Sequence, residues 1–546
     1  MGGQRSNVIR LYLLLLALLA SAAFAQSGYG EAPQLQERVA AGELPPVEER
    51  LPENPLVVPV LERTGDYGGE WRTALSGGGD HIWLQRTLGY ENLVRVTPDL
   101  TEVIPNIAES FEASDDATEF TFHLREGMKW SDGQPFSADD IMFWYEDVLL
   151  NDELTTVPPA WLVSGDEDEL VVVEKLDDDT VVFRFAAPNG LFLQRLARGT
   201  GAGITEFPRH YFEQFHIAYN PEGIDALIAE ADANDWVGLF QQRGGMSSGA
   251  GEYWQAGTVP TLHAWVPANP YGTGTRVVAE RNPYYFKVDP EGNQLPYLDR
   301  VVFNLVDDVE VMLLRALSGE IDMHGRHFNT LTNRAILFDN QERGDYHFFA
   351  MVPDIMNTTV LFLNLTHKDP VKREIFSNKD FRIGLSHAIN REEIIDLIYI
   401  GQGEPYQAAP RPESPFYHER LAKQYTDYNP ELANEHLDRA FPERDSSGYR
   451  LGPDGQRISF VIEATAAPYG EIPDVLELVI GYWREVGIDA QLRMIDRSLL
   501  ETRRAANEHD VTVWAGGGGV EVILNPFWYL PISSASSYAQ AWATWY

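Results

Sequence analysis

One serine lies in a sequence of the kind that carries a catalytic nucleophile. Gly245-Met246-Ser247-Ser248-Gly249 matches G-x-S-x-G, the nucleophile motif of serine hydrolases. In those enzymes the motif follows a buried strand and opens a helix, because only a sharp strand-to-helix turn exposes the hydroxyl. Here the polar segment Gln241 to Gly244 precedes the motif and Ala250 to Glu252 follows it. Neither flank fits, so the sequence predicts a Gly/Ser-rich loop and no catalytic residue.

Two histidines and two acidic runs are the candidate metal ligands. His324 and His327 have the spacing of neighbours on a helical face, but Gly325 between them disfavours a helix. Asp166 to Glu169 and Asp177 to Asp179 flank alternating apolar segments and lack the glycine and spaced oxygen ligands of a calcium loop. We expect these acidic runs to be solvated turns, and we expect neither a metal site nor a cofactor.

Carboxylates are abundant throughout the chain. Its 546 residues include 82 Asp and Glu against 42 Lys and Arg, a formal net charge of −40. Nucleic acids and anionic membranes would be repelled by such a surface, so we expect neither as a partner. A glycosidase needs only two carboxylates at a suitable separation. A secreted carboxylate-based hydrolase therefore stays open as an alternative, although neither H-E-x-x-H nor a phosphate-binding loop occurs in the sequence.

The first residues have the features of an export signal. Arg5 and Arg10 precede the apolar run Leu11 to Leu19, and Ala23-Phe24-Ala25 offers small residues for cleavage. The chain contains no cysteine, which excludes disulfides, thiolate metal sites and a lipid-anchoring cysteine. We therefore expect residues 1–25 to be a signal peptide and the mature protein to be periplasmic and not a lipoprotein.

The most regular part of the sequence runs from Phe120 to Leu149. Phe120 to Leu124 alternates apolar and polar residues, which indicates a strand with one buried face. Asp132-Gly133 has turn chemistry, and Ser137 stands where a helix N-cap is expected. Two acids follow Ser137, and the apolar residues up to Val148 share one helical face. The stretch therefore predicts a strand, a turn and a capped helix.

The wording of this stretch resembles a family signature. Leu124 to Asp140 fills every position of L-R-x-G-x-x-W-S-D-G-x-P-F-[ST]-A-x-D, which is typical of the bacterial family-5 extracellular solute-binding proteins, the peptide-type receptors of ABC importers. Other segments resemble blocks of the same family in the same order, from about residue 66 to about residue 520. They are Asp66–Arg72, Arg281–Phe286, Leu295–Asp299, Ser318–Asp322, Phe381–Arg391 and Asn429–Ala440.

This resemblance implies an α/β fold with two lobes joined by hinge strands. It is the type II periplasmic-binding-protein fold with the extra subdomain of the peptide-binding class. We expect a proline-rich, extended arm at 26–65, lobe I at 66–305 with an inserted subdomain at about 90–195, and lobe II at 306–515. Relatives continue beyond the last strand and return to the first lobe, so we expect 516–546 to start that return and the sequence to be truncated.

The resemblance also implies a function. The lobes close over a peptide or similar small solute, and the closed form delivers the solute to a membrane permease and its ATPase. On this reading the protein is a monomer and has no enzymatic activity. An oligosaccharide or other non-peptide receptor of the same fold is the alternative, and a sensory module without a transporter is a third interpretation.

Residues on both lobes are implied to border the ligand cleft. They are Gly78, Asp80, Tyr271, Gly272, Thr273, Glu471 and Trp514. Glycine-loop N–H groups would contact the ends of the ligand, and aromatic faces its bulk. Peptide-specific relatives place an acid near Glu471 to pair with the α-amino group, and Glu471 is the only candidate at that place here. The alternative is that the glycines form turns, Trp514 is core and Glu471 is a solvated helix acid.

Overall fold

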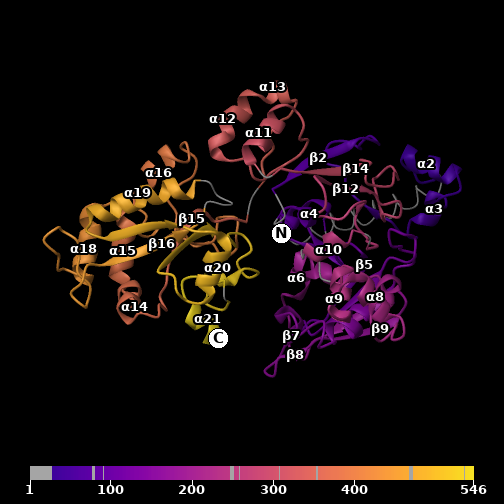
Figure 1. Cartoon of the computed structure of the whole chain (residues 1–546), viewed down its shortest axis with the longest axis horizontal. Coiled ribbons are helices and arrows are strands. Elements are labelled where there is room, and N and C mark those ends of the chain that lie inside the picture. The colour runs from indigo at the N-terminus through magenta and orange to yellow at the C-terminus, as the bar shows by residue number, and fades with distance from the viewer. Residues whose placement is uncertain are drawn as a thin grey trace, which may run out of the picture. The chain divides into compact units, whose positions relative to one another are not determined.

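The computed structural model describes residues 28–76, 80–89, 91–245, 251–257, 259–306, 308–351, 354–465, 471–533 and 535–545. The chain forms two compact units (Figure 1). Unit 1 contains the chain up to Phe328 together with Asn340–Tyr346, and unit 2 contains Asn329–Asp339 and His347 onward. The expected signal peptide, Gly78 and residues 246–249 of the G-x-S-x-G motif lie outside the described residues.

Unit 1 is built on a mixed four-stranded sheet in the order β11-β12-β14-β2. Its strands are β2 (Glu70–Leu75), β11 (Trp265–Pro267), β12 (Arg276–Arg281) and β14 (Arg300–Leu305). β14 pairs with β2 in parallel and with β12 in antiparallel. Ala74, Leu75, Val301 and Phe303 are fully buried, so the sheet borders the core of the unit.

A second, antiparallel sheet of unit 1 has the order β5-β6-β10-β9. Its strands are β5 (Ala108–Ala113), β6 (Glu119–Leu124), β9 (Val172–Asp177) and β10 (Thr180–Arg184). Phe120, Phe122 and Leu124 of β6 are buried, as their alternation predicts. Ser137 and Asp140 form a capping box at helix α5 (Ala138–Phe143), which continues as the π-helix η1 (Trp144–Leu149). The predicted strand, turn and capped helix are confirmed.

Shorter elements complete unit 1. The strands are β1 (Leu56–Val57), β3 (Val94–Val96), β4 (Val103–Pro105), β7 (Val163–Ser164), β8 (Glu169–Leu170) and β13 (Lys287–Val288). The helices are α2 (Pro33–Ala40), α3 (Val47–Arg50), α4 (His81–Leu88), α6 (Phe192–Leu196), α7 (Arg209–Phe212), α8 (Ile224–Ala231), α9 (Trp236–Gln242), α10 (Gly251–Ala256), α11 (Val309–Leu317) and α13 (Gln341–Gly344), with η2 (Ala160–Leu162), η3 (Gly199–Thr205) and η4 (Glu213–Phe215). The acidic runs form the turns between β7 and β8 and between β9 and β10.

The N-terminal arm differs from the expected extended segment, because it contains α2 and α3. Arg50, at the end of α3, is completely buried and donates hydrogen bonds to Pro283 O and to Gln294 Oε1, the latter at 3.0 Å. It also forms an ion pair with Glu31. A buried guanidinium must be fully paired, and these partners fix the arm to unit 1.

The change of unit comes later in the chain than the sequence suggested. We expected lobe II to start at residue 306; β14 lies in the unit 1 sheet as that boundary requires, but unit 1 continues to Phe328. Asp322 explains this, because its carboxylate accepts hydrogen bonds from the backbone N–H of Arg72 at 2.6 Å and from the Arg72 Nε at 3.0 Å. The segment after α11 is thereby bound to β2.

Unit 2 has a four-stranded sheet in the order β15-β18-β16-β17. Its strands are β15 (Asn357–Leu363), β16 (Ser459–Ala464), β17 (Asp489–Met494) and β18 (Val511–Gly516). β16 is parallel to β17 and β18, whereas β15 is antiparallel to β18. The helices are α12 (Leu331–Asp339), α14 (Pro370–Ser377), α15 (Lys379–Ala388), α16 (Arg391–Leu397), α17 (Glu419–Lys423), α18 (Pro430–Ala440), α19 (Ile472–Glu485), α20 (Arg497–Ala505) and α21 (Gln540–Trp545), with η5 (Pro526–Trp528).

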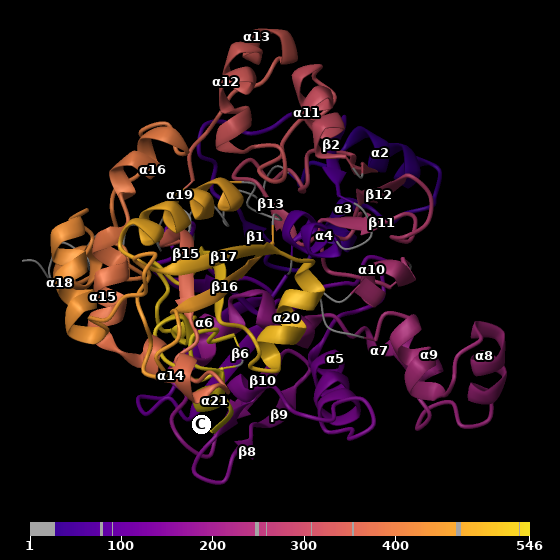
Figure 2. The same ribbon diagram turned by 60° about the vertical axis from the view of Figure 1, so that its left-hand side comes forward.

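The core of unit 2 lies between this sheet and helices α15 and α19, and Figure 2 shows α19 beside the strands. Trp483 of α19 is buried and its Nε1 donates to Leu385 O of α15 at 3.0 Å. The final residues also pack on this unit, since Leu365 N donates to Tyr538 O at 2.8 Å. Residues 516–546 therefore belong to unit 2 as far as the structure describes them.

Candidate functional site

In unit 1 the predicted residues lie at one edge of the mixed sheet. The parallel strands β2 and β14 end together, with Leu75 paired to Leu305. The loop that contains Asp80 follows β2, and the loop that contains Tyr271 to Thr273 leads into β12, whose Arg276 pairs with Asn304. Both loops therefore lie at the carboxyl edge of the parallel strands, where α/β proteins bind ligands.

Asp80 and Tyr271 come together at this edge. Both are buried, with 4% and 2% of their surface exposed. Burial raises the pKa of the Tyr271 phenol, and a hydrogen bond from the Asp80 backbone opposes that rise. Gly272 and Thr273 instead form an exposed turn in which Gly272 has a φ of +89° and Thr273 Oγ1 donates to Pro270 O at 3.1 Å.

The Asp80 carboxylate is the centre of a network that sequence reasoning missed. Its Oδ2 accepts from Ser76 N at 3.0 Å and lies 3.0 Å from His327 Nε2, and its Oδ1 lies 3.2 Å from Arg326 Nη2. Burial by itself raises the pKa of Asp80, but the hydrogen bonds from His327 and Ser76 outweigh it and hold the pKa below its usual value. The carboxylate is therefore ionised and already engaged.

The histidine pair has a different role from the one considered as a metal site. His324 and His327 do not lie on a helix, and His324 Nε2 is 3.2 Å from His327 Nδ1. His324 Nδ1 in turn is 2.8 Å from Thr73 Oγ1, and burial lowers the pKa of His324 to about 4. Within the described ranges no three His, Asp or Glu side chains are placed to hold a metal ion.

A tryptophan completes the unit 1 edge. Trp83 lies on α4, and the guanidinium carbon of Arg326 is 5.8 Å from its ring centre. The Trp83 ring also contacts His324 edge-on, with a centroid separation of 5.5 Å. No sequence signal links these residues, because they are far apart in the chain and meet only through tertiary packing.

The predicted residues of unit 2 also lie at a carboxyl edge. β16 and β18 run parallel with Ile462 opposite Val511, so Trp514 lies beside the end of β16. Glu471 stands at the N-terminus of α19, which follows β16, and Arg497 starts α20, which follows β17. The structure therefore places Glu471, Arg497 and Trp514 at one edge of the sheet.

Trp514 is half-buried and pairs with a cation that the sequence did not reveal. The guanidinium carbon of Arg497 lies 5.0 Å from the centre of its ring. Glu471 is half-exposed, and among the described residues its carboxylate has no cationic partner. Trp514 is therefore not simply a core residue, and Glu471 is an acid without a charge partner at the same edge.

The glycine loop after β18 is held by close packing. A Cβ on Gly519 would lie 3.0 Å from Arg411 Cγ and 3.1 Å from Asp354 O, so a side chain there needs neighbouring atoms to move. The Asp354 carboxylate accepts from the backbone N–H groups of Gly518, Val520 and Glu521 at 2.9–3.1 Å. These N–H groups are thus bound to Asp354 and are not directed to a ligand.

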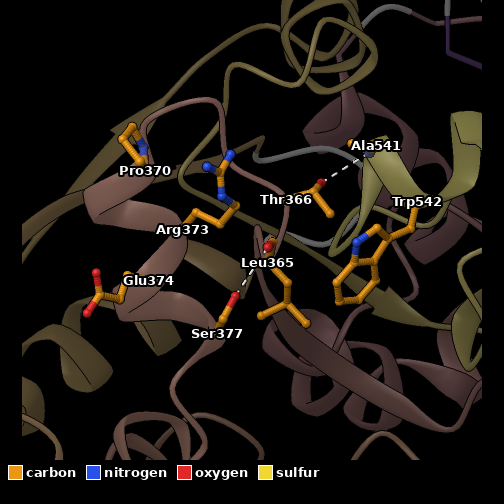
Figure 3. A pocket seen from close by; sticks show the side chains of 8 residues that line it. All are labelled: Leu365, Thr366, Pro370, Arg373, Glu374, Ser377, Ala541 and Trp542. Atoms are coloured by element: carbon orange, nitrogen blue, oxygen red, sulfur yellow. Dashed lines mark hydrogen bonds between the residues drawn. The ribbon is translucent and has the colours of Figure 1, made fainter.

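Two of the cavities that the described residues form lie within unit 2. The larger has a volume of about 900 Å³ and is lined by β15, α15, α16 and the loop at 402–413. The smaller, of about 450 Å³, lies between α14 and α21 and is lined by Leu365, Arg373 and Trp542, among others (Figure 3). Because Leu363 pairs with Val511 at the start of β18, the smaller cavity is at the amino edge of that strand, away from Trp514.

The chain matches known proteins over most of its length. The family model described as bacterial extracellular solute-binding proteins, family 5 middle, matches residues 102–537. A periplasmic alpha-galactoside-binding protein of Rhizobium meliloti is 28% identical over 508 residues, which are 86% of this chain and 68% of that protein. No helix in the described part of the chain is long and apolar enough to cross a membrane.

Solved structures agree with the fold. The structure of an oligopeptide-binding protein, OppA, is 35% identical in sequence and has a TM-score of 0.73. The match covers 95% of this chain and 80% of the OppA chain. The periplasmic binding protein MelB from Agrobacterium fabrum C58, solved in complex with stachyose, has a TM-score of 0.69 at 24% identity. That match covers 93% of this chain and 76% of the MelB chain. The predicted α/β periplasmic-binding-protein fold is confirmed. The chain belongs to family 5 of the bacterial extracellular solute-binding proteins, which are non-enzymatic binding components of ABC transporters.

Proposed function

We propose that the protein is the periplasmic component of an ABC importer and captures a neutral oligosaccharide for delivery to the membrane permease. The carboxyl edges of the two sheets are the proposed contact surfaces, and the ligand favours the closed state because its affinity for that state is higher. Asp80, Tyr271, Glu471 and Trp514 belong to these edges, together with Trp83, Arg326 and Arg497.

The observation that carries this proposal is a tryptophan–arginine pair at each edge. Arg326 lies over Trp83 in unit 1, and Arg497 lies over Trp514 in unit 2. An aromatic ring offers an apolar surface to the C–H face of a sugar, and a guanidinium offers several donors to its hydroxyl groups. Pockets that combine aromatic walls with a few placed polar groups fix the orientation of a ligand.

The alpha-galactoside-binding relative supports a saccharide, since its match covers 86% of this chain. The charges at the unit 1 edge agree with a neutral ligand. Asp80 is bound by Arg326 and His327, so this carboxylate has little capacity left for a ligand ammonium group.

Replacing Trp514 with alanine is expected to weaken the binding of an α-galactoside such as stachyose about tenfold, or about 1.4 kcal/mol. The reason is the loss of the planar surface that the sugar contacts, while the half-exposed position lets the fold persist. Isothermal calorimetry on the mature protein measures the affinity. Trp514→Phe is the matched control and should keep most of the binding. Unchanged affinity in Trp514→Ala would show that the site lies elsewhere.

A peptide is the second candidate, and Glu471 favours it. Its carboxylate has no cationic partner among the described residues, and the OppA structure at 35% identity is named as an oligopeptide-binding protein. If a peptide α-amino group binds there, Glu471→Gln should weaken the binding of a tripeptide by about 1.5–3 kcal/mol, the value of a charge-assisted hydrogen bond. For an oligosaccharide ligand the same change should leave the affinity within twofold. Calorimetric titration with both ligand classes separates these results.

A further inference from the structure

The larger cavity of unit 2 contains none of the residues to which the proposed function assigns a role. Its volume of about 900 Å³ lies within the range of roughly 300–1,000 Å³ that is typical of small-molecule sites. Its lining includes the start of β15, with Asn357 and Thr359, and the loop at 402–413. All of these elements belong to unit 2.

This cavity adjoins the carboxyl edge that carries Trp514. Asn357 at its wall pairs with Gly516, which comes two residues after Trp514 on β18. Arg411 of the loop at 402–413 donates its backbone N–H to Gly519 O at 2.8 Å, and Tyr529 Oη donates to Gly518 O at 2.9 Å. The start of β15 therefore pairs with the end of β18, and the loop at 402–413 is hydrogen-bonded to the glycine loop that follows β18.

The cavity wall offers neutral hydrogen-bonding groups. Asn357 Oδ1 is buried and has no hydrogen-bond partner among the described residues, which is costly unless a ligand or water donates to it. Thr359 Oγ1 lies 3.1 Å from the Tyr399 hydroxyl, and each of these oxygens retains capacity for a further hydrogen bond. Tyr406 and Tyr529 add aromatic surface.

Most charged side chains of the wall are already engaged, and Lys379 is the exception among the described lining residues. Arg391 donates to Ser386 O at 2.8 Å and to Ser386 Oγ at 2.8 Å, and Arg382 donates to Phe376 O at 2.6 Å. Arg411 pairs with Glu413 at 2.9 Å. Beside the apolar residues of β15, α15 and α16, the wall thus offers a ligand hydroxyls, amide groups and tyrosine rings, and these groups suit a hydroxyl-rich neutral molecule.

We propose that this cavity is a subsite for one end of the oligosaccharide, so that it selects ligands by chain length. The proposal rests on the proposed function and extends it: the sugar units nearest Trp514 bind at the carboxyl edge, and the units beyond them occupy the cavity against Asn357 and Thr359. A disaccharide fills the edge alone, whereas a tetrasaccharide reaches the subsite.

The test is calorimetric titration of the mature protein with melibiose, raffinose and stachyose, α-galactosides of two, three and four sugar units. The affinity is expected to rise at least tenfold from melibiose to stachyose. Asn357→Leu removes the buried acceptor, and Thr358→Trp places a large ring at an exposed position of the wall. Each should lower stachyose affinity about tenfold and leave melibiose affinity unchanged.

Ser377→Ala is the matched control, because Ser377 lines the smaller cavity and donates only to Leu365 O at 3.3 Å (Figure 3). It should leave all affinities unchanged, and an unaltered melting temperature in each variant shows that the fold is kept. Equal losses for all lengths, no loss in either variant, or no length dependence in the wild type would overturn the subsite. If the wild type binds peptides and no saccharide, the proposed function falls and the subsite falls with it.

Discussion

Glu91→Ala is expected to lower the free energy of unfolding of unit 1 by about 3–5 kcal/mol, the cost of breaking a buried ion pair from one side. The Glu91 side chain is 6% exposed, and its carboxylate accepts from Lys287 Nζ at 2.9 Å, Tyr285 Oη at 2.7 Å and Asn106 Nδ2 at 2.8 Å. Burial alone raises the pKa of Glu91, but Lys287 and the other donors outweigh it and hold the pKa at about 2. Removing this carboxylate leaves the Lys287 charge buried without its main partner.

The double variant Glu91→Leu with Lys287→Met is the control for this prediction. Replacing both members of a buried pair by apolar residues of similar size is often neutral or stabilising, so most of the loss should be recovered. Calorimetric unfolding of both variants at pH 7 measures the difference. A loss below about 1 kcal/mol in Glu91→Ala would mean that water reaches Lys287 and that the pair is not truly buried. The effect matters for binding because Glu91 follows α4, the helix that carries Trp83.

Elements with a strong local pattern could be predicted from the sequence. The alternation of Phe120 to Leu124 and the cap at Ser137 each depend on neighbours in the chain, and β6 and α5 appear where expected. The family signature identified the fold for the same reason, since it records one continuous stretch. The same resemblance implied that the loops with Asp80 and Tyr271 border the ligand cleft.

Features that depend on partners far along the chain could not be predicted. Arg326 and Arg497 have no motif, and their positions over Trp83 and Trp514 arise only when the sheets form. The end of unit 1 at Phe328 depends on the hydrogen bonds between Asp322 and Arg72, which lie 250 residues apart. The proline-rich arm looks like a linker in sequence, and contacts such as the hydrogen bond from Arg50 to Pro283 O make it part of the unit.

Asp510→Asn is expected to destabilise unit 2 by about 3–5 kcal/mol at pH 7 and to disturb the strand that carries Trp514. Asp510 precedes β18, and its Oδ2 accepts from Lys372 Nζ at 2.6 Å and from Val461 N at 2.9 Å, while Oδ1 lies 3.0 Å from His367 Nε2. These contacts join α14, β16 and the start of β18. Asparagine has one acceptor oxygen in place of the two carboxylate oxygens. The substitution also leaves the charge of Lys372 without its carboxylate partner.

The pH dependence of this loss distinguishes an ionic contact from a merely steric one. Burial raises the pKa of Asp510, but the hydrogen bonds from His367, Lys372 and Val461 outweigh it and hold the pKa at about 2, against an ordinary value of 3.8. Because the folded pKa is the lower one, the stabilisation is complete above about pH 4 and disappears as the pH falls towards 2. The difference between these two pKa values corresponds to roughly 2 kcal/mol. The difference in unfolding free energy between wild type and Asp510→Asn should therefore shrink by about that amount between pH 6 and pH 2, measured by urea denaturation.

The double variant Glu91→Leu with Lys287→Met, in the other unit, is the control. It should leave the contribution of Asp510 to the pH dependence of unit 2 stability unchanged. A difference that stays constant over this range would show that the Asp510 carboxylate contributes through its shape and not through its charge.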